Sequence, residues 1–131
     1  MRKRILVVDD DPELVELVSF NLKRAGYTIG TASNGVEAIK KARSQEPDLI
    51  LLDVMMPEMD GFEVCEILRR DSATASIPIV MLTALSGELG RLASLGSGAT
   101  DFLSKPFSPR LLVKRINDVL KNAGNVRVTT S

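Results

Sequence analysis

Short, almost continuously apolar runs alternate with segments of helical periodicity along most of this chain. A strand that is apolar on both faces must be covered on both sides, as the central strands of a parallel sheet are. Parallel strands are connected by crossovers that are usually helices. The alternation therefore predicts an α/β fold in which helices cover both faces of a parallel sheet.

Five strands and five helices are expected. The strands are residues 5–8, 27–31, 48–53, 77–83 and 100–104, and the helices are residues 12–25, 34–46, 61–70, 85–99 and 109–121. The second strand is the most polar and suits a sheet edge. The fourth helix contains four glycines. Each interior glycine costs about 1 kcal/mol relative to alanine, so we expect this helix to be short or mobile. The alternating strands and helices together predict a doubly wound five-stranded sheet.

The 131 residues fit one domain, which we place at residues 1–123, with residues 124–131 as a C-terminal tail or the start of a linker. Seventeen Lys and Arg balance seventeen Asp and Glu, which argues against nucleic-acid binding by this domain through bulk charge. No stretch is long enough to span a membrane, and the apolar run after the basic N-terminus is too short for a signal peptide. We therefore expect a soluble cytoplasmic protein.

The chain has no histidine and a single cysteine. The first fact excludes histidine-dependent catalysis and zinc or haem sites that use histidine ligands. Cys65 follows a helical pattern of apolar residues and is expected to be a small buried hydrophobe.

Charged and polar residues stand at the predicted carboxyl ends of the strands, where open α/β sheets bind their ligands. They are Asp9, Asp10 and Asp11 after the first strand, Asp53 at the third, Thr83 at the fourth and Lys105 after the fifth. Carboxylates suit a hard cation such as Mg²⁺. A lysine and a hydroxyl beside them offer charge neutralisation and a hydrogen bond to a phosphoryl group. This set predicts phosphoryl transfer onto or off an aspartate.

Some of these residues also have a structural interpretation. Asp11 followed by Pro12 is typical of a helix N-cap with proline at the first helical position. One cap needs one carboxylate, so Asp9 and Asp10 remain for another role. Asp53 is flanked by apolar residues, where an unpaired charge is costly.

Four motifs in this order resemble the receiver domain of two-component response regulators. They are ILVVDDD (5–11), PDLILLDVMMPEMDGFEV (47–64), IPIVMLTA (77–84) and ATDFLSKPF (99–107). The resemblance covers about residues 3–121. It implies a flavodoxin-like fold with strand order 2-1-3-4-5.

The resemblance also implies roles for residues at the strand ends. Asp53 would accept a phosphoryl group from a phosphohistidine on a sensor histidine kinase or a phosphotransfer protein. Asp9, Asp10, Asp53 and the backbone carbonyl of Met55 would bind Mg²⁺, with Mn²⁺ as a substitute, and no organic cofactor is expected. Such a domain is a regulatory phosphoacceptor and not an enzyme, although it assists its own phosphorylation and its slow hydrolysis.

By the same resemblance, Thr83 and Lys105 would contact the phosphoryl group, and Lys105–Pro106 would be a cis peptide. Thr83 and Phe102 would form a switch that changes the face built from the fourth helix, the fifth strand and the fifth helix. That face would contact an output partner or effector domain, or a second copy in a phosphorylation-dependent homodimer.

The chain departs from the family pattern in two respects, one near the site and one in the proposed contact face. Met55 and Leu85 are apolar where many receivers place polar residues that influence hydrolysis, so we predict slow autodephosphorylation. Leu111 stands where an acidic residue serves intersubunit ion pairs, and Ser97 where Asp is common, although Asp101, Arg91 and Arg115 are present. An apolar contact through Leu111 is therefore a hypothesis.

Three other interpretations are open. A pseudo-receiver that works without phosphorylation usually lacks part of the acidic, Thr and Lys set. A haloacid-dehalogenase-type phosphatase shares the spacing of Asp9 and Asp11, but Pro12 and Glu13 follow instead of its usual residues. A flavin-binding protein would place a phosphate-binding loop where these aspartates would repel phosphate.

Overall fold

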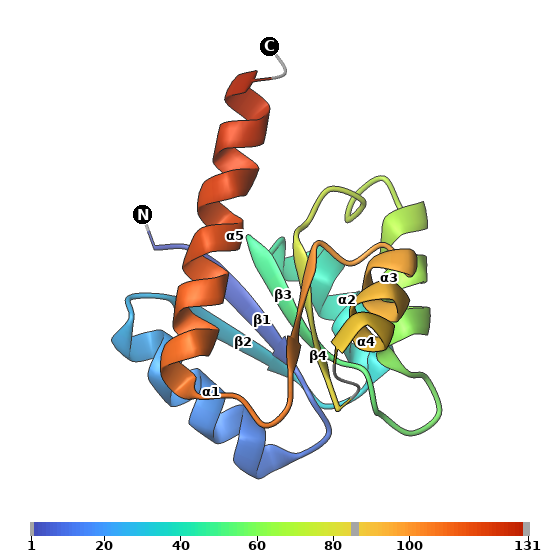
Figure 1. The fold of residues 1–131 in the computed structure, drawn as a ribbon. Coiled ribbons are helices and arrows are strands. Elements are labelled where there is room, and N and C mark those ends of the chain that lie inside the picture. Colours follow the sequence, from blue (N-terminus) through green and yellow to red (C-terminus); the bar gives the residue numbers. More distant parts are fainter. Residues whose placement is uncertain (1, 85–86, 130–131) are drawn as a thin grey trace.

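A five-stranded parallel sheet lies at the centre of the computed structural model, which describes residues 2–84 and 87–129 (Figure 1). The strands are β1 (Arg4–Val8), β2 (Thr28–Ala32), β3 (Leu49–Asp53), β4 (Ile79–Thr83) and β5 (Asp101–Ser104). The helices are α1 (Pro12–Arg24), α2 (Gly35–Gln45), α3 (Gly61–Arg70), α4 (Gly87–Gly96) and α5 (Pro109–Thr129). The strand order is β2-β1-β3-β4-β5, which confirms the predicted flavodoxin-like, doubly wound fold, with polar β2 at one edge.

The sheet separates two apolar layers, because successive strand residues point to opposite faces. In β1, Ile5 and Val7 pack with residues of α1 and α5, whereas Leu6 and Val8 pack with residues of α2 and α3. Figure 1 shows α4 beside α3 on the latter side. Cys65 is fully buried among apolar residues there, as predicted. All side chains of β3 and β4 are buried, and all of these residues are apolar except Asp53 and Thr83 at the strand ends.

Helix starts are fixed by side-chain caps close to the carboxyl edge of the sheet. Asp11 accepts a hydrogen bond from the Glu13 amide at 3.0 Å, so α1 begins directly after β1, as predicted. Asp60 and Glu63 form a reciprocal capping box at the start of α3. These caps set the length of the loops that follow β1 and β3.

Several element boundaries differ from the prediction. The fourth strand begins at Ile79 because Pro78 has no amide hydrogen to offer a ladder. Helix α5 does not end at residue 121 but continues to Thr129, and its last turns stand clear of the sheet in Figure 1. A single glycine at position 124 weakens a helix without ending it. The division into a domain at residues 1–123 and a tail at 124–131 stays a prediction.

Helix α4 spans ten residues and is as short as expected. Within the described part of the chain, no helix combines the length and the apolar character needed to cross a membrane.

Candidate functional site

The pairing of β1 with β3 brings Asp9 close to Asp53. Val8 and Leu52 are direct partners in this parallel pair, so the residues that follow them reach the carboxyl edge side by side. Neighbouring strands are about 4.8 Å apart. The strand order reverses between β1 and β3, which is where sheets of this type bind ligands. Both aspartates are only 2% exposed.

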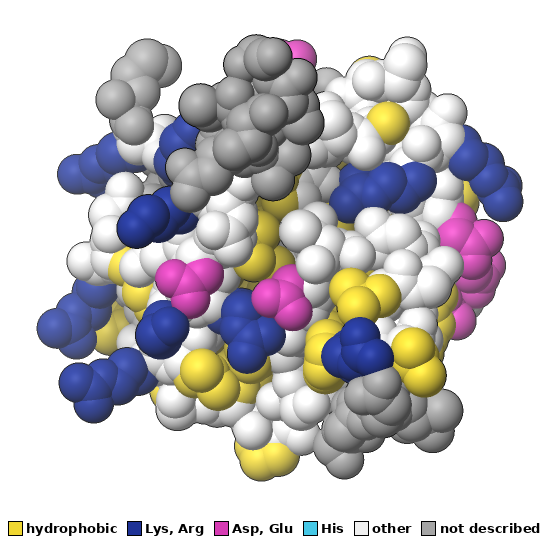
Figure 2. Space-filling view, turned by 45° about the horizontal axis from the view of Figure 1, so that its top comes forward, with side chains coloured by type: hydrophobic (Ala, Val, Ile, Leu, Met, Phe, Trp, Pro, Cys, Tyr) yellow, Lys and Arg dark blue, Asp and Glu magenta, His cyan; other side chains and the backbone are white. Residues whose placement is uncertain are grey.

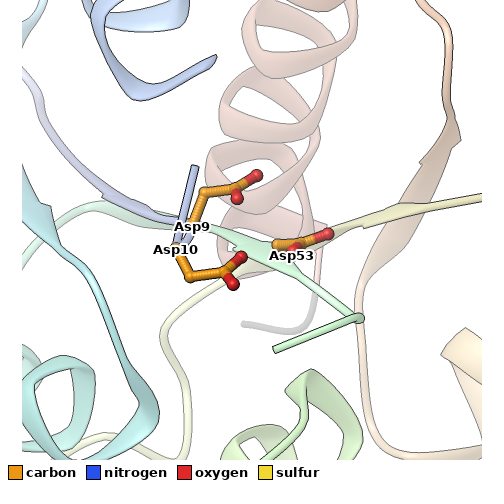
Figure 3. Close-up of side chains that lie close together, drawn as sticks. All are labelled: Asp9, Asp10 and Asp53. Carbon is orange, nitrogen blue, oxygen red and sulfur yellow. The ribbon is translucent and has the colours of Figure 1, made fainter. Parts of the chain in front are cut away.

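Three carboxylates converge at this edge (Figure 3). Asp9, Asp10 and Asp53 each offer an oxygen atom within 4.8 Å of the others. Asp10 is exposed, whereas the other two are buried. Figure 3 shows Asp9 and Asp10 at the end of one strand and Asp53 at the end of its neighbour, with their carboxyl groups turned the same way. Oxygen donors at this spacing could hold a metal ion, and a hard cation would offset their mutual repulsion.

Lys105 joins two of these carboxylates. Its Nζ donates to Oδ1 of Asp53 at 2.9 Å and to Oδ2 of Asp9 at 3.3 Å. Partial burial alone would lower the pKa of Lys105, but the hydrogen bonds and negative charges of Asp53 and Asp9 outweigh it and raise the pKa. The side chain is therefore a positively charged ammonium at neutral pH.

The pKa of Asp9 is raised above that of an ordinary aspartate. Burial is the main cause, and the negative charge of Asp53 adds to it. The Asp11 amide, which donates to Oδ1 of Asp9 at 2.9 Å, and Lys105 act in the opposite direction. The surroundings of Asp9 therefore disfavour its charged form.

Thr83 and the start of the β5–α5 connection complete this edge. Thr83 ends β4 and is buried, and its carbonyl oxygen accepts a hydrogen bond from the Lys105 amide at 2.7 Å. The Lys105–Pro106 peptide bond is cis. Phe102 on β5 is partly buried and packs against the apolar layer that contains α2 and α3. Leu85, on which the prediction of slow autodephosphorylation partly rests, lies outside the described residues.

Gly61 is a further residue of this edge that is not among the predicted site residues, because it has no functional group. Its amide donates to the carbonyl oxygen of Val54 at 2.9 Å, which closes the loop after Asp53. That loop exposes the side chain of Met55, which is 70% accessible. The sequence signal is the dipeptide Asp60–Gly61, where a helix cap is followed by a residue without a side chain.

The predicted residues are thus placed together at one edge of the sheet. Asp9, Asp10, Asp53 and Lys105 form one charged group, and Thr83 ends the neighbouring strand. A hollow of about 420 Å³ opens beside Asp9 and Asp10 and is also lined by residues of α1 and of the β2–α2 connection. Asp9 and Asp10 therefore border a hollow that is open to the surface.

Residues 5–117 match the family model described as the response regulator receiver domain. PhoP of Bacillus subtilis, the alkaline phosphatase synthesis transcriptional regulatory protein, is 48% identical over 123 residues, which cover 94% of this chain and 50% of that protein. RpaA of Synechocystis sp., a DNA-binding dual master transcriptional regulator, is 44% identical over 123 residues, which cover 94% and 51%. The chain spans about half the length of these curated relatives.

The chain is also similar to a response regulator whose structure has been solved. The chemotaxis response regulator CheY4 of Vibrio cholerae is 38% identical, with a TM-score of 0.86 over 91% of this chain and 99% of that chain.

Proposed function

The chain belongs to the receiver-domain family of two-component response regulators, and from this premise we propose that Asp53 is the phosphoacceptor of a two-component phosphorelay. The observation that carries the proposal is the contact of Lys105 with Asp53 at the centre of the carboxylate group. The donor would be a phosphohistidine on a sensor histidine kinase or on a phosphotransfer protein. The domain would act as a regulatory switch, as its family does.

The proposed transfer is a displacement at phosphorus. A carboxylate oxygen of Asp53 forms the new P–O bond while the P–N bond to the donor imidazole breaks, and the electron pair stays on the ring nitrogen. Lys105 faces Asp53 and would neutralise negative charge on the phosphoryl oxygens. Thr83 ends the strand beside β3 and would donate its hydroxyl hydrogen to a phosphoryl oxygen.

The donor set fits a hard divalent cation, for which we propose Mg²⁺, with Mn²⁺ as a substitute. Two of the three carboxylates are buried, and they share the single ammonium of Lys105. Asp9, Asp10 and Asp53 would hold the ion together with the backbone carbonyl of Met55. When bound, it would supply further charge neutralisation to the phosphoryl oxygens.

The signal would reach the output through α4, β5 and α5. Thr83 and Phe102 would form the switch, with the half-buried ring of Phe102 turning inward when Thr83 moves toward the phosphoryl group. The names of the relatives describe transcriptional and DNA-binding regulators. We propose that this face couples to an effector of that kind, while this domain itself does not bind nucleic acid.

The same face would also serve a phosphorylation-dependent homodimer. Arg115 donates to Oδ1 of Asp101 at 3.2 Å within the chain, while Leu111 on α5 is 42% exposed. Figure 2 shows a face of the molecule on which hydrophobic, basic and acidic side chains alternate. In such a dimer, an apolar contact through Leu111 would replace the intersubunit ion pair that an acidic residue forms at this position in the family.

The proposal is tested by incubating the chain with Mg²⁺ and acetyl phosphate and then measuring its intact mass. The mass should rise by one phosphoryl group, and the gain should disappear when Mg²⁺ is chelated. No gain at any Mg²⁺ concentration would favour the pseudo-receiver, and continuous release of phosphate from phosphomonoesters would favour the phosphatase.

A further inference from the structure

We infer that Gly61 is a positioning residue for the cation and phosphoryl site. The inference rests on the proposed function, because it concerns the loop that follows the proposed phosphoacceptor. Gly61 carries no chemical group that could touch a ligand. Its contribution is the space beside it, which lets α3 begin directly against the main chain of β3.

A side chain at position 61 would collide with main-chain atoms. A Cβ atom there would lie 2.5 Å from the carbonyl oxygen of Asp53 and 2.9 Å from Cα of Val54. These atoms belong to the end of a buried strand and have no rotamer through which to move away. Among the described residues the glycines with positive φ are Gly26 and Gly98. A glycine is thus needed at position 61 because the helix start lies so close to the main chain of Asp53 and Val54, and not because the backbone there has a positive φ.

The close approach keeps one loop closed. The Val54 amide donates to the carbonyl oxygen of Leu82 at 2.9 Å, so the first residue of the loop is fixed to β4. The Gly61 amide donates back to the carbonyl oxygen of Val54 at 2.9 Å, so the last residue is fixed to the first. An added methyl group would push α3 away and break the second bond. The loop between these points contains Met55, so an oxygen donor proposed for the cation would move.

Two other glycines provide contrast. A Cβ atom on Gly35 would meet the side chains of Met59 and Val64, at 2.8 Å from Sδ and 2.9 Å from Cγ2. These are side-chain ends, and the flexible methionine can shift. A Cβ atom on Gly96 would meet nothing within 4 Å. Gly96→Ala is therefore the matched control, because it is the same chemical change in a helix without the collision.

The experiment compares wild type, Gly61→Ala and Gly96→Ala by calorimetric titration with Mg²⁺ and by urea unfolding in Mg²⁺-free buffer. Gly61→Ala should unfold cooperatively but bind Mg²⁺ roughly tenfold to a hundredfold more weakly, as loss of an outer-shell support does. Gly96→Ala should keep wild-type affinity. A Gly61→Ala protein that is less stable but binds Mg²⁺ as tightly as wild type would overturn the positioning role.

Measurements on the wild-type chain distinguish failure of the positioning role from failure of the proposed function. A wild type that neither binds Mg²⁺ nor gains mass with acetyl phosphate overturns the proposed function itself. If Gly61→Ala does not unfold cooperatively, amide resonances of the wild type are followed during Mg²⁺ titration. The Gly61 resonance should then shift together with that of Met55, and a Gly61 resonance that stays in place while Met55 moves would contradict the inference.

Discussion

The ammonium group of Lys105 lies 2.9 Å from Oδ1 of Asp53 and 3.3 Å from Oδ2 of Asp9, so one cation holds two buried carboxylates together. The three groups come from the ends of three different strands. A third carboxylate, Asp10, stands beside them. The fold thus gathers more negative than positive charge at one edge of the sheet, and the stability and chemistry of this edge depend on what compensates the excess.

Replacement of Lys105 by Met should destabilise the Mg²⁺-free protein. Asp9 and Asp53 would lose their shared partner, and we expect the free energy of unfolding in urea to fall by about 1–3 kcal/mol. Saturating Mg²⁺ should reduce this loss, because the ion would offset the same charges. The matched control is Lys114→Met, whose exposed pair with Asp118 should cost less than about 0.5 kcal/mol. Equal losses in the two variants would contradict this account.

The raised pKa of Asp9 predicts a pH dependence with a defined sign. A carboxyl group whose folded-state pKa is raised stabilises the fold only while it is protonated. In Mg²⁺-free buffer, its contribution to the free energy of unfolding should therefore fall as the pH rises from 3.8 through the raised value. The difference between Asp9→Asn and wild type, measured by urea unfolding, should grow over that interval. A difference that does not change with pH would contradict the prediction.

Over the same interval Mg²⁺ affinity should change in the opposite direction. The ion needs the carboxylate form, so its dissociation constant should decrease as Asp9 loses its proton. Lys105, whose pKa is raised, stays charged throughout. Calorimetric titrations at several pH values would measure this, and an affinity that is constant across the interval would exclude Asp9 as a ligand.

Arg69 should contribute to stability far more than its neighbour Arg70. The Arg69 guanidinium donates to the carbonyl oxygens of Gly98, Ala75 and Ile77 at 2.8, 3.1 and 2.7 Å. Arg69→Met would leave these acceptors without their donor, at a cost of about 2–4 kcal/mol. Arg70 forms an exposed pair with Glu66 at 3.6 Å, and Arg70→Met should cost little. Urea unfolding of both variants tests this, and similar losses would refute it.

The phosphorylated state should be long-lived. Met55 exposes an apolar side chain beside the site, where a polar group could otherwise orient a water molecule. We expect Asp53 phosphate, followed by intact mass after removal of the donor, to last far longer than seconds. Met55→Asn should shorten the lifetime. A lifetime of only seconds in the wild type would contradict the prediction.

Self-association after phosphorylation should depend on Leu111. Leu111→Glu places a charge on the exposed part of α5 without touching the site, so phosphorylation by acetyl phosphate should be unchanged. Sedimentation velocity of the phosphorylated protein should show weaker dimerisation in this variant than in wild type. Unchanged association, or tighter association through a restored ion pair, would remove Leu111 from the contact.

Much of the fold could be predicted because its determinants are local. The apolar runs of β3 and β4 indicate strands buried on both faces, and Asp11 with Pro12 marks a helix start. The convergence of Asp9 with Asp53 follows from a general property of parallel sheets, whose carboxyl ends meet at one edge.

Other features could not be predicted because they depend on contacts between distant segments. The role of Gly61 arises from its approach to the carbonyl oxygen of Asp53, and a glycine at a helix start gives only a weak sequence signal. Arg69 lies on a helix like its exposed neighbour Arg70, and only the packing of the loops around it makes it a partly buried donor to three carbonyl oxygens. Helix α5 extends beyond the predicted end at residue 121, because a single glycine within a helix weakens it without ending it.

The central claim is that the phosphoryl group resides on Asp53. The most direct measurement is to phosphorylate the chain with acetyl phosphate and Mg²⁺, reduce it with borohydride, which converts an aspartyl phosphate to homoserine, and sequence the peptides by mass spectrometry. The account predicts homoserine at position 53, and none in an Asp53→Asn protein treated in the same way. Homoserine at Asp9 or Asp10, or at no position in a protein that has gained mass, would contradict it.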